Sequence, residues 1–305
     1  METPHRRSSD IISNLPDQVI ETILAYWPIQ DAVQTSLLSN KWRYKWNLIP
    51  TLVFHEERTH FPPDTKAFAS NKIVNFVDRV LLQHKGSIHK FELSTHSLQD
   101  YVIDSWLLFL SKNGVKELVL QFLSRDRYCD QHFGQGKVSN LVRGLGCLTA
   151  LEKLVIGECF MEFLAMGILP KRLLVTYDRL KSISLFINFN DLNQSLAMLF
   201  LFQSSPNLQE LKMLANQVAA TEYVVDFWKA LGHLNCSMNH LRMVKIIMWG
   251  AKSELELIKF LLANSPVLEI LSVNHITSEK VDESRVLKEL VRFPRASTKA
   301  QIEYK

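Results

Sequence analysis

Apolar residues recur along most of the chain in a six-position pattern, apolar-x-x-apolar-x-apolar. Seven copies are present, and their first positions are separated by 27, 36, 29, 28, 33 and 27 residues. Alternate side chains of a β-strand point to the same face, so the second and third apolar positions of each copy can enter one core. The pattern predicts a stack of similar strand-and-return units. The seven copies are Ile88/Phe91/Leu93, Val115/Leu118/Leu120, Leu151/Leu154/Ile156, Leu180/Ile183/Leu185, Leu208/Leu211/Met213, Leu241/Val244/Ile246 and Leu268/Leu271/Val273.

The spacing of the copies agrees with the period of leucine-rich repeats, with two longer insertions. In such repeats the position three residues beyond the last apolar residue is usually Asn or Cys. Cys159, Asn188 and Asn216 occupy it here in three copies only, so the repeats are degenerate. Seven repeats would form an open arc of parallel strands with helical or irregular returns between them. An ordinary α/β sheet is the alternative, because alternating strands and helices produce a similar pattern.

Residues 10–52 follow a helical pattern instead. Pro16 suits the first turn of a helix, where its missing N–H is not needed. Pro28 ends this helix, and Asp31 can cap a second one. Trp42 and Trp46, four residues apart, share one face of a third short helix. Three such helices cannot bury all of their apolar surface, so some is left for a partner. A helical cap docked on the following domain is the alternative.

Composition and charge exclude several classes of protein. The 305 residues are 47% hydrophobic and 22% charged, which is enough to bury a sizeable core and excludes disorder throughout. Only 10 are glycine, which is few for nucleotide-binding loops. The net charge of +4 is spread along the chain, so nucleic acid is not a predicted partner. The longest apolar stretches fall far short of the roughly 18 residues of a membrane span, so no membrane is expected.

The cysteines and the N-terminus indicate a cellular compartment. Cys129, Cys147, Cys159 and Cys236 stand far apart with no C-x-x-C pair. That arrangement favours free thiols in a reducing compartment over a disulfide framework or a zinc site. The first ten residues lead into no apolar segment of the kind that a secretory signal needs. We therefore expect an intracellular protein, in the nucleus or the cytoplasm, with no metal and no other cofactor.

Motifs that carry catalysis are missing from the sequence. It contains no G-x-S-x-G, no H-E-x-x-H, no P-loop and no dinucleotide-binding fingerprint. Cys129 and His132 could form a nucleophile and its base, but no third orienting group is visible beside them. Chance proximity is the better interpretation of that pair. We predict a binding protein with no catalytic residues, and an enzyme or a small-molecule receptor is the remaining alternative.

The helical segment resembles an F-box, the module that binds the Skp-type adaptor of cullin-RING ubiquitin ligases. One departure is Trp27, where the family more often has Leu. The resemblance rests on Leu15-Pro16, Ile23-Leu24, Pro28 with Asp31, and Ser39 with Trp42, Arg43 and Trp46. By this resemblance, the residues expected to contact the adaptor are Leu15, Pro16, Val19, Ile23, Leu24, Pro28 and Leu38.

Residues 250–273 and 285–305 resemble the FBD segment of plant F-box and leucine-rich-repeat proteins. The resemblance rests on Glu254, Glu256, Leu257, Phe260, Leu261, Asn264, Ser265, Pro266 and Leu268, with Phe293, Pro294, Arg295, Ala296 and Ser297. Taken together, these likenesses imply an α/β protein with a three-helix F-box and an open solenoid of about seven degenerate repeats. The expected divisions are an F-box at 8–52, a linker and connecting helix at 53–87, leucine-rich repeats at 88–240, and terminal repeats with the FBD-like segment at 241–305.

The same resemblance implies the function of a non-catalytic substrate-recognition subunit in an SCF-type (Skp–cullin–F-box) ubiquitin ligase. The F-box would hold a Skp-type adaptor and through it a cullin, while the repeats would hold a protein target. A leucine-rich-repeat scaffold without ligase activity is the alternative.

A target surface can be located from the strand pattern. The residue after each third core position leaves the strand on the side away from the core. Phe186, Leu214 and Ile247 hold this position in three successive repeats and should form one apolar strip. Charged residues flank the strip, and we predict that it is part of the target surface. The alternatives are that a loop or the C-terminal tail covers this strip, or that the strand register is shifted by one residue. The flanking residues are Glu210, Lys212 and Lys245.

Overall fold

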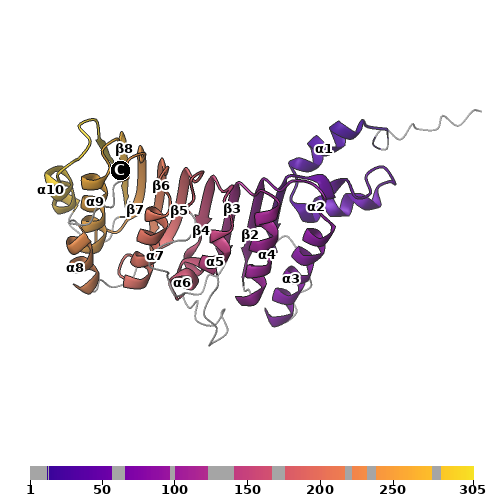
Figure 1. Ribbon diagram of the computed structural model, residues 1–305, viewed down its shortest axis with the longest axis horizontal. Helices are drawn as coiled ribbons and strands as arrows, with labels where there is room; N and C mark the ends of the chain where they lie inside the picture. The colour runs from indigo at the N-terminus through magenta and orange to yellow at the C-terminus, as the bar shows by residue number, and fades with distance from the viewer. Residues whose placement is uncertain are drawn as a thin grey trace, which may run out of the picture.

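The computed structural model describes residues 12, 14–56, 66–96, 100–122, 141–166, 176–216, 222–231, 238–276 and 283–305 (Figure 1). Within these residues, nine strands form one parallel sheet in the order of the chain. Each strand pairs with the next one in sequence, as expected of a solenoid of stacked units. The strands are β1 (Thr51–His55), β2 (Lys90–Thr95), β3 (Glu117–Phe122), β4 (Lys153–Ile156), β5 (Ser182–Ile187), β6 (Glu210–Ala215), β7 (Met243–Met248), β8 (Ile270–His275) and β9 (Gln301–Tyr304).

Helices connect the strands and gather on one side of the sheet (Figure 1). They begin with α1 (Asp17–Ala25), α2 (Ile29–Gln34) and the 3-10 helices η1 (Thr35–Leu37) and η2 (Lys45–Leu48). The connecting helices are α3 (Lys66–Gln83), α4 (Asp100–Lys112), α5 (Leu141–Gly146), α6 (Glu158–Met166), α7 (Leu192–Gln203), α8 (Glu222–Leu231), α9 (Lys252–Asn264) and α10 (Glu283–Arg292). The predicted mixed α/β class is confirmed.

The core follows the seven apolar copies. Their second and third positions lie on β2 to β8 and are all buried. The pairing register places equivalent positions side by side, for example Leu154 beside Ile183, and Ile183 beside Leu211. The sheet also has two strands beyond the seven copies, β1 and β9. One of them, β1, carries the same pattern at Ile49/Leu52/Phe54, all buried.

The third predicted helix is replaced by turns and the 3-10 helix η2. Tyr44, which precedes η2, has a φ of 66°. A residue in this left-handed region cannot continue an α-helix, so the helical spacing of Trp42 and Trp46 does not produce one. Both Trp side chains are still buried. The spacing thus marks positions that reach the core without forming the expected element.

Two further expectations can be compared with the structure. Cys159 is disulfide-bonded, so the prediction of free thiols is wrong for this residue. In the described part of the chain, no helix is long and apolar enough to cross a membrane. The candidate pair Cys129 and His132 lies outside the described residues.

Candidate partner-binding surfaces

Exposed apolar side chains concentrate in the N-terminal segment, on its helices and in the turns between them. Of the eighteen large apolar residues that are exposed in the described chain, eight lie between positions 12 and 48. The most exposed are Leu37 at 89% and Tyr26 at 84%. Such a concentration on one small unit is typical of a protein-binding surface. The eight residues are Ile12, Val19, Tyr26, Trp27, Leu37, Leu38, Tyr44 and Leu48.

The opposite faces of the same helices hold this surface in place. Ile20 and Leu24 on α1, and Ile29 on α2, are fully buried and belong to the main core. Lys45 of η2 forms ion pairs with Asp17 at 2.9 Å and with Glu21 at 3.8 Å, which tie η2 to α1. The helices are therefore anchored to the core, while most of the exposed apolar residues, such as Tyr26, Trp27 and Leu38, lie at their ends and in the turns between them. This arrangement presents an apolar surface that the fold itself does not need.

The seven predicted adaptor-contact residues differ in how far their side chains are exposed to solvent. Pro16, Val19 and Leu38 are exposed. Leu24 is 0% exposed, so it packs the core and offers no surface to a partner, contrary to the prediction. Sequence reasoning also missed Leu37, although two adjacent Leu residues in a short helix cannot both face the core. The half-buried members are Leu15, Ile23 and Pro28.

A second surface lies on the face of the sheet opposite the helices, which we call the open face. Here the register places Phe186 of β5 beside Leu214 of β6, and Leu214 beside Ile247 of β7. Phe186 is 37% exposed, and the other two are half-buried. The predicted strip is thus a continuous apolar row across three strands. The C-terminal tail does not cover it, since residues 301–304 form β9 and pair with β8.

Next to the apolar row runs a row of lysines. Lys212 lies beside Lys245 in the pairing of β6 with β7. Lys212 forms an ion pair with Glu210 at 2.9 Å, and the Ser182 hydroxyl donates a hydrogen bond to the same carboxylate at 2.9 Å. The hydrogen bond from Lys212, with that from Ser182, holds the pKa of Glu210 below its ordinary value despite partial burial. Lys245 has no ion-pair partner among the described residues.

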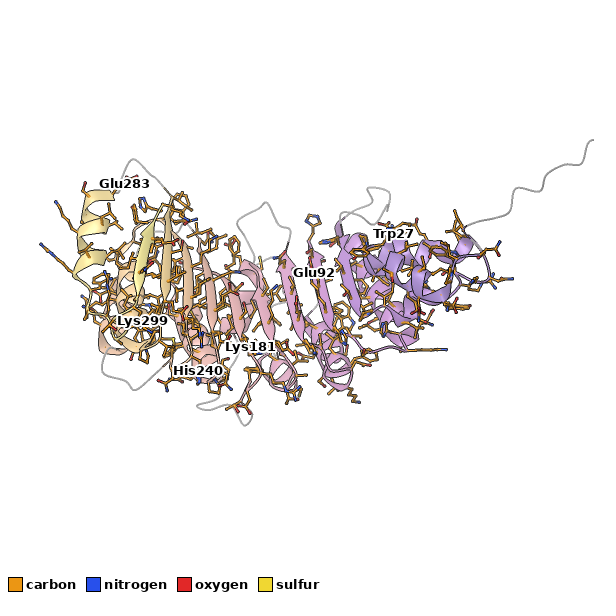
Figure 2. All side chains as sticks on the ribbon, turned by 90° about the horizontal axis from the view of Figure 1, so that it is seen from above. Trp27, Glu92, Lys181, His240, Glu283 and Lys299 are labelled. Atoms are coloured by element: carbon orange, nitrogen blue, oxygen red, sulfur yellow. The ribbon has the colours of Figure 1, made fainter. Side chains whose placement is uncertain are left out.

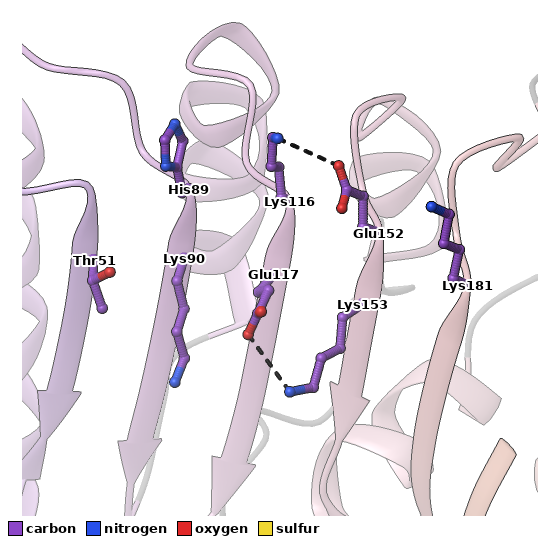
Figure 3. Close-up of a pocket in the computed structure, with 8 residues that line it drawn as sticks. All are labelled: Thr51, His89, Lys90, Lys116, Glu117, Glu152, Lys153 and Lys181. Atoms are coloured by element: carbon purple, nitrogen blue, oxygen red, sulfur yellow. Dashed lines mark ion pairs between the residues drawn. The ribbon is translucent and has the colours of Figure 1, made fainter. Parts of the chain in front are cut away.

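At the beginning of β2 to β5, the open face carries a depression of about 370 Å³ (Figure 3). Two ion pairs cross it, between Lys116 and Glu152 at 3.4 Å and between Lys153 and Glu117 at 3.6 Å. These pairs cancel most of the charge within the depression. The lining residues are Thr51, His89, Lys90, Lys116, Glu117, Glu152, Lys153 and Lys181.

The two surfaces lie in different parts of the molecule. Figure 2 shows Trp27 among the N-terminal helices and Lys181 on the middle strands. One partner on the helices would therefore leave the open face of the middle strands accessible to another.

A buried carboxylate holds the C-terminal end together. Glu254 of α9 accepts backbone hydrogen bonds from Ala251 at 2.7 Å and from Trp249 at 3.1 Å. It satisfies the N–H groups of the two residues Trp249 and Ala251 that lead into α9, which is the role of the third helical residue in a capping box. Burial raises the pKa of Glu254 to about 7, against the lowering effect of these hydrogen bonds. Its surroundings identify a structural cap for the helix.

The last residues of the chain close the end of the sheet. The Ser297 hydroxyl donates to the Leu268 carbonyl at 2.6 Å, and the Ala296 amide donates to the Leu262 carbonyl at 2.9 Å. These bonds bring β9 against β8. Residues 296 and 297, part of the FBD-like segment predicted from the sequence, thus fasten this segment to the end of α9 and the turn between α9 and β8.

The described residues contain no group of three or more His, Cys, Asp or Glu side chains that could hold a metal ion. The depression on the open face is lined mainly by lysines and glutamates, four of which form ion pairs with one another, and by Thr51 and His89. What the geometry offers is two surfaces for partners.

Two family models match parts of this chain, one near its N-terminus and one in its C-terminal third. The family model of the F-box domain matches residues 12–52, and that of FBD matches residues 232–273. The first match lies inside the predicted division at 8–52. The second begins before the predicted boundary at 241. The division of the chain into four parts remains a prediction.

Several proteins of Arabidopsis thaliana are similar to this chain. An F-box/FBD/LRR-repeat protein is 32% identical over an alignment that covers 97% of this chain and 98% of the relative. Two F-box/LRR-repeat proteins are 37% and 38% identical, over 37% and 38% of this chain, and the chain matches only 30% and 23% of their length. The likeness to the first relative extends over the whole fold. The chain therefore belongs to the F-box/FBD/LRR-repeat proteins.

Proposed function

We propose that this chain is the non-catalytic substrate-recognition subunit of an SCF-type ubiquitin ligase. Its apolar N-terminal surface binds a Skp-type adaptor and through it a cullin, and its open face binds a protein target. The observation that carries the proposal is the concentration of exposed apolar side chains in the segment that the F-box model matches. In this proposal β2 to β8 are the seven leucine-rich repeats, and the assembly works inside the cell, in the nucleus or the cytoplasm.

The mechanism of such a subunit is positional. Holding the adaptor with one surface and the target with another makes their encounter intramolecular, which raises the effective concentration of target lysines near the ubiquitin-conjugating enzyme. The rigid parallel sheet between the two surfaces fixes their separation. No residue of this chain forms or breaks a bond in that scheme.

Co-expression with a Skp-type adaptor followed by size-exclusion chromatography tests the proposal. The wild-type chain should elute with the adaptor in a one-to-one complex. Leu37→Asp should abolish co-elution, because it places a charge in the most exposed part of the apolar surface. Leu82→Asp is the matched control, since Leu82 is 83% exposed on α3, outside the N-terminal surface.

The outcomes separate the proposal from a scaffold without ligase activity. Co-elution of the wild type and the Leu82→Asp variant, with loss in Leu37→Asp, supports the ligase subunit. A folded wild-type chain that elutes without the adaptor contradicts it, and the N-terminal helices would then serve only as a cap. Circular dichroism of each variant shows whether the chain remains folded.

A further inference from the structure

The open face divides into two parts of different charge. On β2 to β4 and the residues directly before them, three lysines and three glutamates occur, and all six are paired. The pairs are Lys90–Glu92 at 2.8 Å, Lys116–Glu152 at 3.4 Å and Lys153–Glu117 at 3.6 Å. This part of the surface is electrically balanced by its own side chains. A charged partner would have to break existing pairs in order to bind there.

On β5 to β7 the positive and negative side chains are not matched in number. Glu210 is the acidic residue of this part, and Lys212 already neutralises it. Arg242, directly before β7, pairs with Glu269 at 3.7 Å. Lys181, directly before β5, and Lys245 on β7 are exposed and have no ion-pair partner among the described residues. Lys181 lines the depression, where Figure 3 marks no ion pair to it. On the strands that carry the apolar row, Lys245 therefore remains an uncompensated positive charge.

We infer that β5 to β7 bind the target through a short segment in which acidic residues lie next to apolar ones. The apolar side chains would cover Phe186, Leu214 and Ile247, and an acidic group would pair with Lys245, two residues before Ile247 on β7. Three neighbouring strands span about 10 Å, so a few extended residues are enough to cross them. The inference rests on the proposed function, because it specifies the target that the receptor takes.

The depression at the beginning of β2 to β5 is a weaker candidate for the same role. Two Lys–Glu pairs already cross it between neighbouring strands, and Lys181 is the lining lysine without an ion pair among the described residues (Figure 3). Exposed ion pairs gain little from exchange with a partner's charges. The strip on β5 to β7 combines exposed apolar side chains, which a partner can cover, with an unpaired lysine, with which an acidic group can form an ion pair.

Selection from a phage-displayed library of random peptides tests the inference on the full-length chain. The selected peptides should be enriched in Asp or Glu beside Leu, Ile, Phe or Met. A synthetic peptide of the enriched sequence should bind at least tenfold more weakly to Lys245→Glu and to Leu214→Ser than to the wild type. Its affinity for the wild type should decrease as salt is raised.

Matched variants on the balanced part serve as controls. Lys116→Glu makes the same change of charge on the same face, and Val155→Ser removes an apolar side chain in the neighbouring row of β4. Each should change the affinity less than twofold. The inference is overturned if no peptide is selected, if the selected peptides show no acidic enrichment, or if Lys116→Glu weakens binding as much as Lys245→Glu.

Measuring adaptor co-elution and peptide selection on the same full-length chain distinguishes this inference from the proposed function. Adaptor co-elution without acidic enrichment overturns the inference and leaves the ligase subunit intact. Acidic enrichment that depends on Lys245, in a chain that does not bind the adaptor, supports the surface and contradicts the ligase subunit.

Discussion

The strands β1–β4 and the strands β5–β7 share one sheet, one register and one core, yet their open faces differ. The inward positions of both parts are apolar and fully buried, as at Leu154 and Leu211. The outward positions of β2–β4 carry matched charges, whereas those of β5–β7 carry the apolar row and an unmatched lysine, Lys245. The core pattern is sufficient for folding, so the outward positions are free to differ. Recognition can therefore be placed on part of a uniform scaffold.

The largest expected effect tests the common core. Leu154→Ala on β4 and Leu211→Ala on β6 should each lower the free energy of unfolding by about 2–5 kcal/mol, because both remove a fully buried side chain. Urea denaturation monitored by circular dichroism measures both. Leu82→Ala, at an exposed position, should change stability by less than about 0.5 kcal/mol. A loss below about 1 kcal/mol at either core position would show that the two parts do not share one core.

The next effect concerns the C-terminal end that supports β5–β7. The pKa of Glu254 is about 7 in the folded chain, above its ordinary value of 4.5. The folded chain thus binds this proton more tightly than the unfolded chain, and stability falls as the pH rises from about 4.5 to about 7. The loss should reach up to about 3 kcal/mol, at 1.36 kcal/mol for each pH unit. Urea denaturation at pH 5 and pH 7.5 measures it.

The variant Glu254→Gln isolates this contribution, because a neutral side chain does not titrate. Its free energy of unfolding should fall less between pH 5 and pH 7.5 than that of the wild type. Glu256→Gln, two residues away and paired with Lys259 at 3.6 Å, should keep the wild-type pH dependence. Identical pH dependence in the wild type and in Glu254→Gln would contradict the assignment.

The smallest effect is also the sharpest test of the charge difference. Lys153→Gln removes one member of an ion pair and should destabilise the fold by up to about 1 kcal/mol. Lys245→Gln removes a like charge that lies directly beside Lys212, and it should leave stability unchanged or raise it by a few tenths of a kcal/mol. Thermal denaturation at low salt compares the two. The same sign of change in both variants would remove the distinction between the two parts.

Most of the sheet could be predicted from the spacing of apolar residues alone. The seven copies mark β2 to β8 because a strand buries every second residue, and the row of Phe186, Leu214 and Ile247 follows from the same alternation. Strand β1 was missed although Ile49, Leu52 and Phe54 repeat the pattern, since they stand at the end of a segment that is otherwise helical.

The partner surfaces were only partly predictable. Helical spacing shows that α1 has apolar side chains around much of its circumference, but the choice of the buried side depends on the sheet against which it packs. Leu24 therefore faces the core, while Val19 faces solvent. The break at Tyr44 comes from a backbone angle that no residue preference indicates for Tyr. The unpaired state of Lys181 and Lys245 depends on cross-strand neighbours and requires the register.

Hydrogen exchange of the full-length chain, with and without a Skp-type adaptor, tests the central claim most directly, because it locates the contact as well as detecting it. The account predicts slower exchange in residues 14–48 when the adaptor is present, and unchanged exchange in β5 to β7. No slowing in residues 14–48 would contradict the claim, as would slowing centred on β5 to β7.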